Sequence, residues 1–211
     1  MPNYCGNTLT LTHDNPEMIS RAKAAFAEGE FLNEFIPVPE ELKIVAGQVG
    51  DPDEQAQLEA QTQANVERHG YGNWYDFCVN EWGTKWDVGD GQGIQTWDDH
   101  ELVVYFDSAW SPPVAAYEKL LDLGFTVYAT YYEPGSAFAG IYEDGVDDCY
   151  DLSDMDSGDV QQQLPPELDD AFGISESMAE YERENEEELT VWYRDGVEEV
   201  GLVPHDPPKK Q

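Results

Sequence analysis

Residues 101–142 read ELVVYFDSAWSPPVAAYEKLLDLGFTVYATYYEPGSAFAGIY, and this stretch decides the fold. Glu101 to Ser108 and Phe125 to Tyr132 are rich in β-branched and aromatic residues, which is typical of strands. Between them, Ser111-Pro112-Pro113 predicts the start of a helix that buries Val114, Tyr117 and Leu121. A turn at Glu133-Pro134-Gly135 then predicts a hairpin that returns through 137–142.

The N-terminal part repeats the same strand–helix pattern. Asn7 to Thr12 alternates polar and apolar residues, as a half-buried strand does. Asp14-Asn15-Pro16-Glu17 combines a capping residue, a proline and an acid, which predicts a helix start. The apolar face of that helix would contain Ile19, Ala22 and Phe26. Phe31 to Leu42 is expected to be extended because prolines disfavour helix in the residue before them.

The middle of the chain is less regular. Residues 46–70 are polar and Gln-rich, so they are interpreted as an insertion that contains a solvent-exposed helix. Tyr71 to Trp82 places large apolar side chains on one helical face and predicts a short core helix. A strand is expected to begin at Lys85-Trp86-Asp87. Strands that alternate with helices and end in a hairpin predict an α+β fold, an antiparallel sheet with helices on one face.

The charge of the chain is extreme. Its 45 acidic and 10 basic residues give a net charge of −35, yet 40% of the residues are hydrophobic, so a core is expected beneath an anionic surface. From Glu133 to the end, 23 acids and four bases give −19. We expect a first domain over 1–145 and an acidic extension over 146–211. Glu143 to Asp159 is interpreted as an acidic loop, with helices from about Glu167 and over Glu176–Glu188 and a hairpin at Asp195-Gly196.

Several classes of protein are disfavoured by composition. No early apolar run follows a basic segment, and no run is long enough to span a membrane, so a cytosolic protein is expected. Cys5, Cys78 and Cys149 lie too far apart for zinc-ribbon, iron–sulfur or redox motifs. The histidines are isolated, the segments rich in aromatic residues contain no nucleophile–base pair, and the acidic segment lacks the EF-hand pattern. We therefore expect no enzyme activity, no metal and no cofactor.

Four segments in order resemble one known family. They are MPNYCGNTL over 1–9, YDFCVNEWGTKWD over 75–87, FDSAWSPP over 106–113 and YEPGSAFAG over 132–140. Together they resemble the YubB-type ferredoxin-like domain of plasmid and bacteriophage proteins. The resemblance covers roughly residues 1–145 and implies a ferredoxin-like fold and a mobile-element origin, but no settled activity.

Two sets of residues are candidate sites. The first is a candidate pocket that would join polar groups set among the aromatic residues of the family blocks: Asn80, Lys85, Asp87 and Asp107. The alternative interpretation of these blocks is a plain aromatic core with capping residues. The second is a surface for a protein partner, made by acids of the C-terminal third: Asp144, Asp147, Asp148, Asp151, Asp154, Asp156, Glu176, Glu180, Glu184, Glu187 and Glu188.

The acidic set suggests a decoy. Acids four residues apart on a helix repeat every 6 Å or so, and seven over Glu176–Glu188 approach, without reaching, the charge density of duplex DNA. Such a surface repels nucleic acid and attracts proteins that bind it. The leading hypothesis is a DNA-mimic inhibitor of a host nucleic-acid-binding protein, of the anti-restriction or anti-CRISPR type. The alternatives are a small-ligand or enzymatic domain that uses the Trp-rich blocks, a halophile-adapted cytosolic protein, and acids that serve only solubility.

Overall fold

The computed structural model describes residues 3–187, 189–194 and 197–202. The chain divides into two compact units, Met1–Ser153 and Asp154–Gln211, and each is described by itself. The first unit extends past residue 145 because the segment after it forms a sixth strand of the sheet. No helix among the described residues has the length and apolar character that a bilayer crossing requires.

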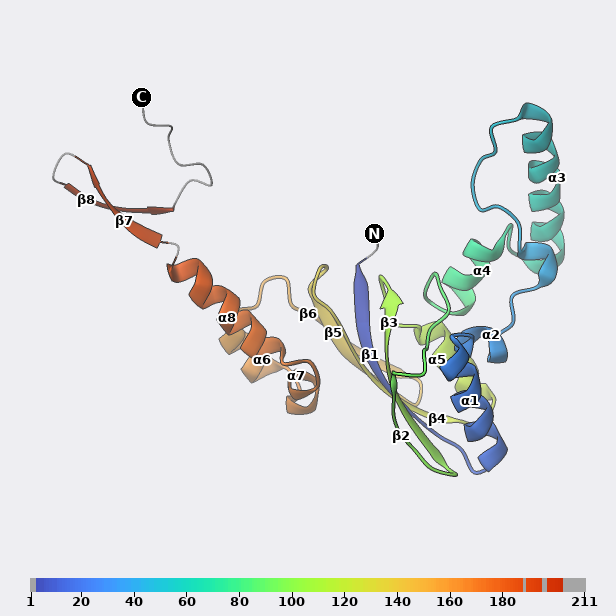
Figure 1. Cartoon of the computed structure of the whole chain (residues 1–211), viewed down its shortest axis with the longest axis horizontal. Helices are drawn as coiled ribbons and strands as arrows, with labels where there is room; N and C mark the ends of the chain where they lie inside the picture. Colours follow the sequence, from blue (N-terminus) through green and yellow to red (C-terminus); the bar gives the residue numbers. More distant parts are fainter. Residues whose placement is uncertain (1–2, 188, 195–196, 203–211) are drawn as a thin grey trace. The chain divides into compact units, whose positions relative to one another are not determined.

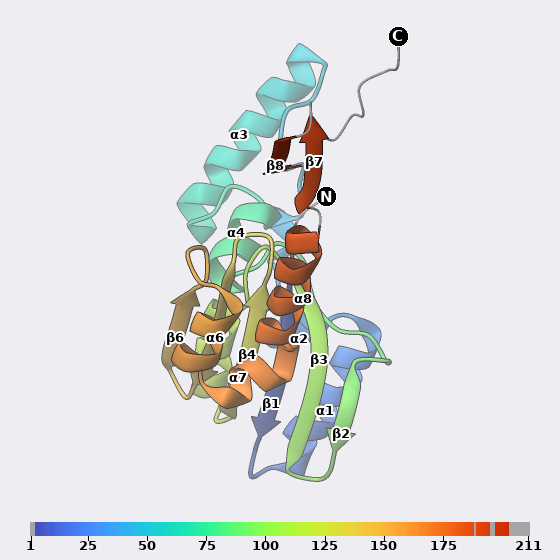
Figure 2. The same ribbon diagram turned by 90° about the vertical axis from the view of Figure 1, so that its left-hand side faces the viewer.

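A six-stranded antiparallel sheet organises the first unit (Figure 1). Its order is β2-β3-β1-β4-β5-β6, and Figure 2 shows β2 and β6 at its opposite edges. The first four strands in this order make the expected ferredoxin-like arrangement, with α5 (Val114–Asp122) between β3 and β4 and a longer helical connection, which begins with α1 (Pro16–Glu28), between β1 and β2. The strands are β1 (Tyr4–Thr12), β2 (Ile94–Trp97), β3 (Glu101–Ala109), β4 (Thr126–Glu133), β5 (Phe138–Glu143) and β6 (Val146–Asp151).

Two helices, α1 and α5, cover the same face of this sheet. The α1 helix has the predicted cap, since Asn15 accepts a hydrogen bond from the Glu17 N–H, and it buries Ile19, Ala22 and Phe26 as expected. The α5 helix buries Ala116, Tyr117 and Leu120. The expected face through Val114 and Leu121 is only partly buried, at the edge of the core.

The connection from α1 to β2 is more helical than predicted. It contains α2 (Phe31–Phe35), η1 (Glu40–Leu42), α3 (Pro52–His69) and α4 (Trp74–Glu81). The extended segment expected from Phe31 was wrong at its start, because the prolines at 37 and 39 constrain only the residues just before them. The polar insertion does form the expected helix, α3, which buries only Asn65 among its side chains. The Asn65 amide donates to the backbone oxygens of Glu41, in η1, and Gly72, just before α4. It thereby attaches α3 to these two neighbouring segments.

The predicted acidic loop after Glu143 is wrong over most of its length. Asp144 and Gly145 form a turn with positive φ, and β6 then pairs with β5 in regular antiparallel register. Val146, Cys149 and Tyr150 have strand propensity, and charged side chains are common on an edge strand. The acids at 147, 148 and 151 therefore lie on a strand of the first unit.

The second unit is a helical group followed by a hairpin. It contains α6 (Ser157–Gln163), α7 (Pro166–Phe172), α8 (Ile174–Glu187), β7 (Leu189–Arg194) and β8 (Val197–Leu202). Val160, Leu168 and Ile174 are buried, one from each helix. The predicted helices and the final hairpin are confirmed in position, while the predicted turn at 195–196 lies outside the described residues.

Candidate functional site

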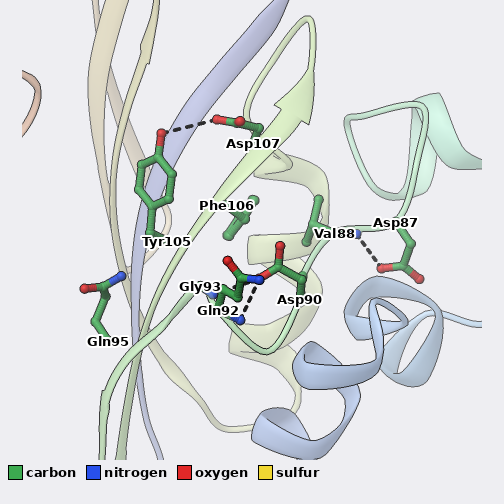
Figure 3. A pocket seen from close by; sticks show the side chains of 10 residues that line it. Asp87, Val88, Asp90, Gln92, Gly93, Gln95, Tyr105, Phe106 and Asp107 are labelled. Atoms are coloured by element: carbon green, nitrogen blue, oxygen red, sulfur yellow. Dashed lines mark hydrogen bonds between the residues drawn. The ribbon is translucent and has the colours of Figure 1, made fainter.

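A cavity of about 350 Å³ lies between the loop 87–93 and strand β3 (Figure 3). Its acidic lining residues are Asp87, Asp90 and Asp107. Two of the four residues predicted to share a pocket, Asp87 and Asp107, therefore line one cavity. Lys85 is not among the lining residues, and neither is Asn80, whose exposed amide donates to the backbone oxygen of Asp76 in its own helix.

Asp87 holds the local structure together. Its Oδ1 accepts from the N–H groups of Leu32 at 2.6 Å and Val88 at 2.8 Å, and its Oδ2 accepts from Asn33 N–H at 2.9 Å. Burial raises the pKa of this carboxyl, and the three backbone N–H donors oppose that rise. Asp87 thus ties the start of α2 to the loop that precedes β2, a structural role that sequence spacing did not reveal.

The other acids of the cavity are also engaged. Asp90 Oδ1 accepts from the N–H groups of Gln92 and Gly93, which forms the turn before β2. Tyr105 donates its hydroxyl proton to Asp107 at 3.3 Å, as Figure 3 shows. Within the described ranges, no group of three or more His, Cys, Asp or Glu side chains is arranged to hold a metal ion. The cavity is lined by carboxylates, and its lining contains no Ser, Thr, Cys, Lys or His.

The cysteines do not change this conclusion. Burial raises the pKa of Cys5 and of Cys78 to about 12, so both thiols are protonated at neutral pH. Cys149 is exposed on β6. Its neighbour Asp147 accepts a hydrogen bond from Tyr131 Oη at 2.7 Å, and burial together with this bond raises the pKa of Tyr131.

Lys85 lies instead among aromatic rings, two of which, Trp86 and Trp110, the alternative interpretation of the family blocks placed in the core. Its Nζ is 4.7 Å from the ring centroid of Trp86, 5.3 Å from that of Trp110 and 5.7 Å from that of Tyr75. Trp86 is 42% exposed and Trp110 is 43% exposed, so the core interpretation is wrong for these two indoles. We call these four residues the aromatic cluster.

The two loops that carry Lys85, Trp86 and Trp110 are joined by hydrogen bonds, while Tyr75 belongs to α4. The Thr84 hydroxyl both donates to the oxygen and accepts from the N–H of Ala109, each at 3.0 Å. Ser111 Oγ donates to Gly83 O at 2.7 Å, and Ser108 Oγ donates to Ser111 O at 2.7 Å. These contacts, rather than strand pairing, fix the 83–86 segment, so the strand expected to begin at Lys85 was wrong.

Trp110 itself has a left-handed backbone, with φ at 67°. A bulky side chain at such a φ is an outlier that costs roughly 1–2 kcal/mol. We expect Trp110→Gly to unfold with a free energy about 0.5–1 kcal/mol higher than Trp110→Ala, because glycine accepts this φ without strain. Denaturant unfolding of the two variants measures the difference. Equal stabilities would show that this backbone angle is not strained.

The acids predicted to contact a partner fall on both units. On the first unit, Asp144 accepts from Val127 N–H at 2.9 Å, Asp147 accepts from Tyr131, and Asp151 accepts from Ser153. On the second, Asp156 caps α6. Glu187 is in the last turn of α8, and Glu188 lies outside the described residues. Five are exposed and make no hydrogen bond or ion pair with a described residue: Asp148, Asp154, Glu176, Glu180 and Glu184.

The acids of α8 are of two kinds: one accepts hydrogen bonds from another helix, and others are exposed without a partner among the described residues. Both carboxylate oxygens of Glu182 accept from Ser157, one from its N–H and one from its hydroxyl, which joins α8 to α6. Residues two positions apart point to opposite sides of a helix, whereas residues four apart share a side. The row formed by Glu176, Glu180 and Glu184 therefore lies opposite Glu182 and faces away from α6. We call these three residues the α8 row.

No Lys or Arg whose side chain the structure describes forms an ion pair with this row. Four Lys and Arg ion pairs are found in the described parts of the chain, and all involve residues of the first unit: Arg21–Glu34, Lys43–Glu40, Arg68–Glu41 and Lys119–Glu81. In the described part of the second unit, Arg183 Nε donates to the oxygen of Ala179 and forms no ion pair. Among the described residues, the α8 row is thus a line of negative charge without an ion-pair partner.

Comparison with known proteins gives one distant structural similarity. No family model and no curated protein matches the chain. The crystal structure of protein api92 from Yersinia pseudotuberculosis, family model DUF1281, is similar with a TM-score of 0.36 and 14% identity, over 72% of this chain and 98% of that chain. The fold and the sites therefore rest on the residues of this chain.

Proposed function

We propose that this chain is an acidic decoy that occupies the nucleic-acid groove of a host protein. The α8 row carries the proposal: three exposed carboxylates on one side of a helix, without an internal partner among the described residues. Four-residue steps place them about 6 Å apart along the axis. A groove built from Lys and Arg for phosphates would accept such a row of carboxylates in the same way.

The mechanism would be steric and electrostatic, without chemistry. Carboxylates would replace phosphates against the basic groove, and the charge of −35 would accelerate encounter with a cationic partner. Asp148 and Asp154 are additional exposed acids that suit this role. Acids that already accept internal hydrogen bonds, such as Asp144 and Glu182, are better explained as structural.

We further infer that the target is a defence or other nucleic-acid-binding protein in the cytosol of a bacterial host. This part rests on the resemblance of the Trp-Gly-Thr-Lys-Trp and Ala-Trp-Ser-Pro-Pro blocks to YubB-type domains of plasmids and bacteriophages. It would make the chain a mobile-element protein of the anti-restriction or anti-CRISPR type.

An affinity capture tests the proposal. The tagged full chain is incubated with a bacterial lysate at about 0.15 M and about 1 M salt, with and without competing duplex DNA. We expect nucleic-acid-binding proteins to be captured at the lower salt and released by either treatment, because salt screens charge contacts. Capture that resists both salt and DNA would contradict the decoy mechanism.

The stability of the isolated protein at low salt distinguishes the decoy from a halophile-adapted protein. Self-repulsion of the excess charge opposes compactness, so screening should raise the melting temperature. We expect the chain to be folded at 0.05 M NaCl and to melt a few degrees higher at 0.5 M, by about 1 kcal/mol or less of added stability. A chain that unfolds below molar KCl in circular dichroism would instead be halophile-adapted.

A further inference from the structure

The aromatic cluster has the geometry of a cation-binding site. Three ring centroids, from Tyr75, Trp86 and Trp110, lie between 4.7 and 5.7 Å from one ammonium. Attraction between a cation and an aromatic face acts within about 6 Å, and cages of several rings are used to recognise quaternary ammonium groups. We call the three rings of Tyr75, Trp86 and Trp110 the cage. The cation that lies among them here is the ammonium of Lys85, from the same chain.

Lys85 occupies the cage without support from a carboxylate. It forms no ion pair with any described residue, although the chain has 45 acidic residues. The rings alone are therefore the observed partners of its ammonium among the described residues. A primary ammonium is compact and strongly hydrated, so its water shell competes with the rings. An alkylated ammonium is less hydrated and would lose less on entering the same cage.

The cage is also pre-organised and accessible. The hydrogen bonds from Thr84 and Ser111 fix the two loops, and the left-handed φ of Trp110 is held in place by a bond from its N–H to Asn3 O at 2.9 Å. Unusual backbone angles of this kind gather at ligand clamps. Both indoles keep over two fifths of their surface exposed, so a ligand can reach the rings from solvent.

We propose that Tyr75, Trp86 and Trp110 form a site for an alkylated ammonium group, and that Lys85 fills this site until such a group displaces it. The net charge of −35 favours a cation over an anion here and raises the local concentration of cationic ligands. The ligand class is a quaternary or methylated ammonium, carried by a small molecule or by a methylated lysine. This inference does not depend on the decoy function.

The test removes the internal cation. Tetramethylammonium chloride is titrated into the full-length wild type and Lys85→Ala at constant ionic strength, with binding followed by the NMR signals of the indole N–H groups. We expect saturable binding to Lys85→Ala that is about tenfold tighter than to the wild type, since the ligand no longer competes with a tethered ammonium. Adding Trp110→Ala to Lys85→Ala should abolish it.

Lys23 offers a matched control. Its Nζ lies 3.1 Å from the ring centroid of Trp97, and no second ring among the described residues forms a cation–π contact with it. Lys23→Ala changes the net charge by the same amount and exposes a single indole, so it should bind no better than the wild type. Equal gains in the two variants would show a diffuse charge effect and overturn the proposal.

Two further arms complete the test. Lys85→Met removes the ammonium but keeps an apolar side chain beside the three rings, which preserves the local packing. A folded Lys85→Met variant should therefore also bind tetramethylammonium more tightly than the wild type. If it does not, the proposal is overturned. If neither Lys85 variant folds, the wild type is titrated with a molar excess of tetramethylammonium. The indole N–H signal of Trp86 should then shift in the wild type but not in Trp110→Ala. The absence of a shift in the wild type would overturn the proposal. Choline and an N-acetyl trimethyllysine amide then distinguish a small-molecule source from a protein source.

Discussion

Replacing the α8 row, Glu176, Glu180 and Glu184, with glutamine is expected to reduce partner binding about a hundredfold or more. Each lost contact between a carboxylate and a basic side chain is worth about 1 kcal/mol or more at an electrostatically matched interface. The change removes only charge, because glutamine keeps the size and helix propensity of glutamate. Affinity capture of the target, quantified by mass spectrometry, measures the loss.

The same variant should be about as stable as the wild type, because the relief of like-charge repulsion is offset by the loss of the favourable interaction between Glu176, in the first turn of α8, and the helix N-terminus. Glu176/Glu180 and Glu180/Glu184 are like-charge neighbours on α8, and such pairs are destabilising by roughly 0.2–0.5 kcal/mol each. Thermal unfolding followed by circular dichroism checks this. Reduced capture together with a nearly unchanged melting temperature separates loss of recognition from loss of folding.

The α3 helix provides the matched control. Glu54, Glu59 and Glu67 are exposed on it, and changing all three to glutamine alters the net charge by the same three units. If recognition uses the α8 row, the α3 variant should capture the target as the wild type does. Equal losses in both variants would show that only total charge matters, and retained capture in the α8 variant would refute the contact assignment.

The second large effect is on stability and concerns Asp87. We expect Asp87→Ala to lower the free energy of unfolding by about 3 kcal/mol, because the N–H groups of Leu32, Asn33 and Val88 lose their acceptors. Within the described part of the chain, the exposed Asp107 side chain accepts only the 3.3 Å bond from Tyr105, so Asp107→Ala should change stability by less than about 0.5 kcal/mol. Urea unfolding of both variants measures the contrast, and similar values would contradict the structural role of Asp87.

The pKa of Asp87 adds a pH dependence with a defined sign. Burial raises this pKa above 3.8 in the folded protein, so the folded state holds the proton more tightly than the unfolded state does. The contribution of this group is therefore fully present below pH 3.8 and is lost as the pH rises through the folded pKa. Asp87→Asn resembles the neutral acid, so between pH 4 and 7 its stability should fall less with pH than that of the wild type. A parallel pH profile would contradict this.

The sequence predicted those helices and strands whose signals lie within a few residues of one another. The cap at Asn15, the buried face through Ile19 and Phe26, and the strands on both sides of α5 are set by residues a few positions apart. The prediction failed where distant contacts decide. Thr84 pairs with Ala109 across 25 positions and so prevents the strand expected at Lys85. Pairing with β5 makes a strand of a segment whose charge suggested a loop.

The candidate sites show the same division. Sequence charge identified the acids of α8, but only the structure distinguishes the α8 row from Glu182, whose partner Ser157 is 25 positions away. The predicted pocket placed Lys85 with Asp87, although these near neighbours in sequence serve different sites. The adjacency of Lys85 and Trp86 in the sequence was the one local signal for a cation near an indole. The approach of Trp110 from another loop had no local signal.

The central claim is that the chain and nucleic acid compete for one groove of the target. The most direct measurement is therefore a displacement assay with the captured protein, fluorescently labelled duplex DNA and the full-length chain at about 0.15 M salt. We predict that the wild type and the α3 variant displace the DNA completely, and that the α8 variant does not. A ternary complex, in which the target holds the chain and the DNA together, would contradict the account.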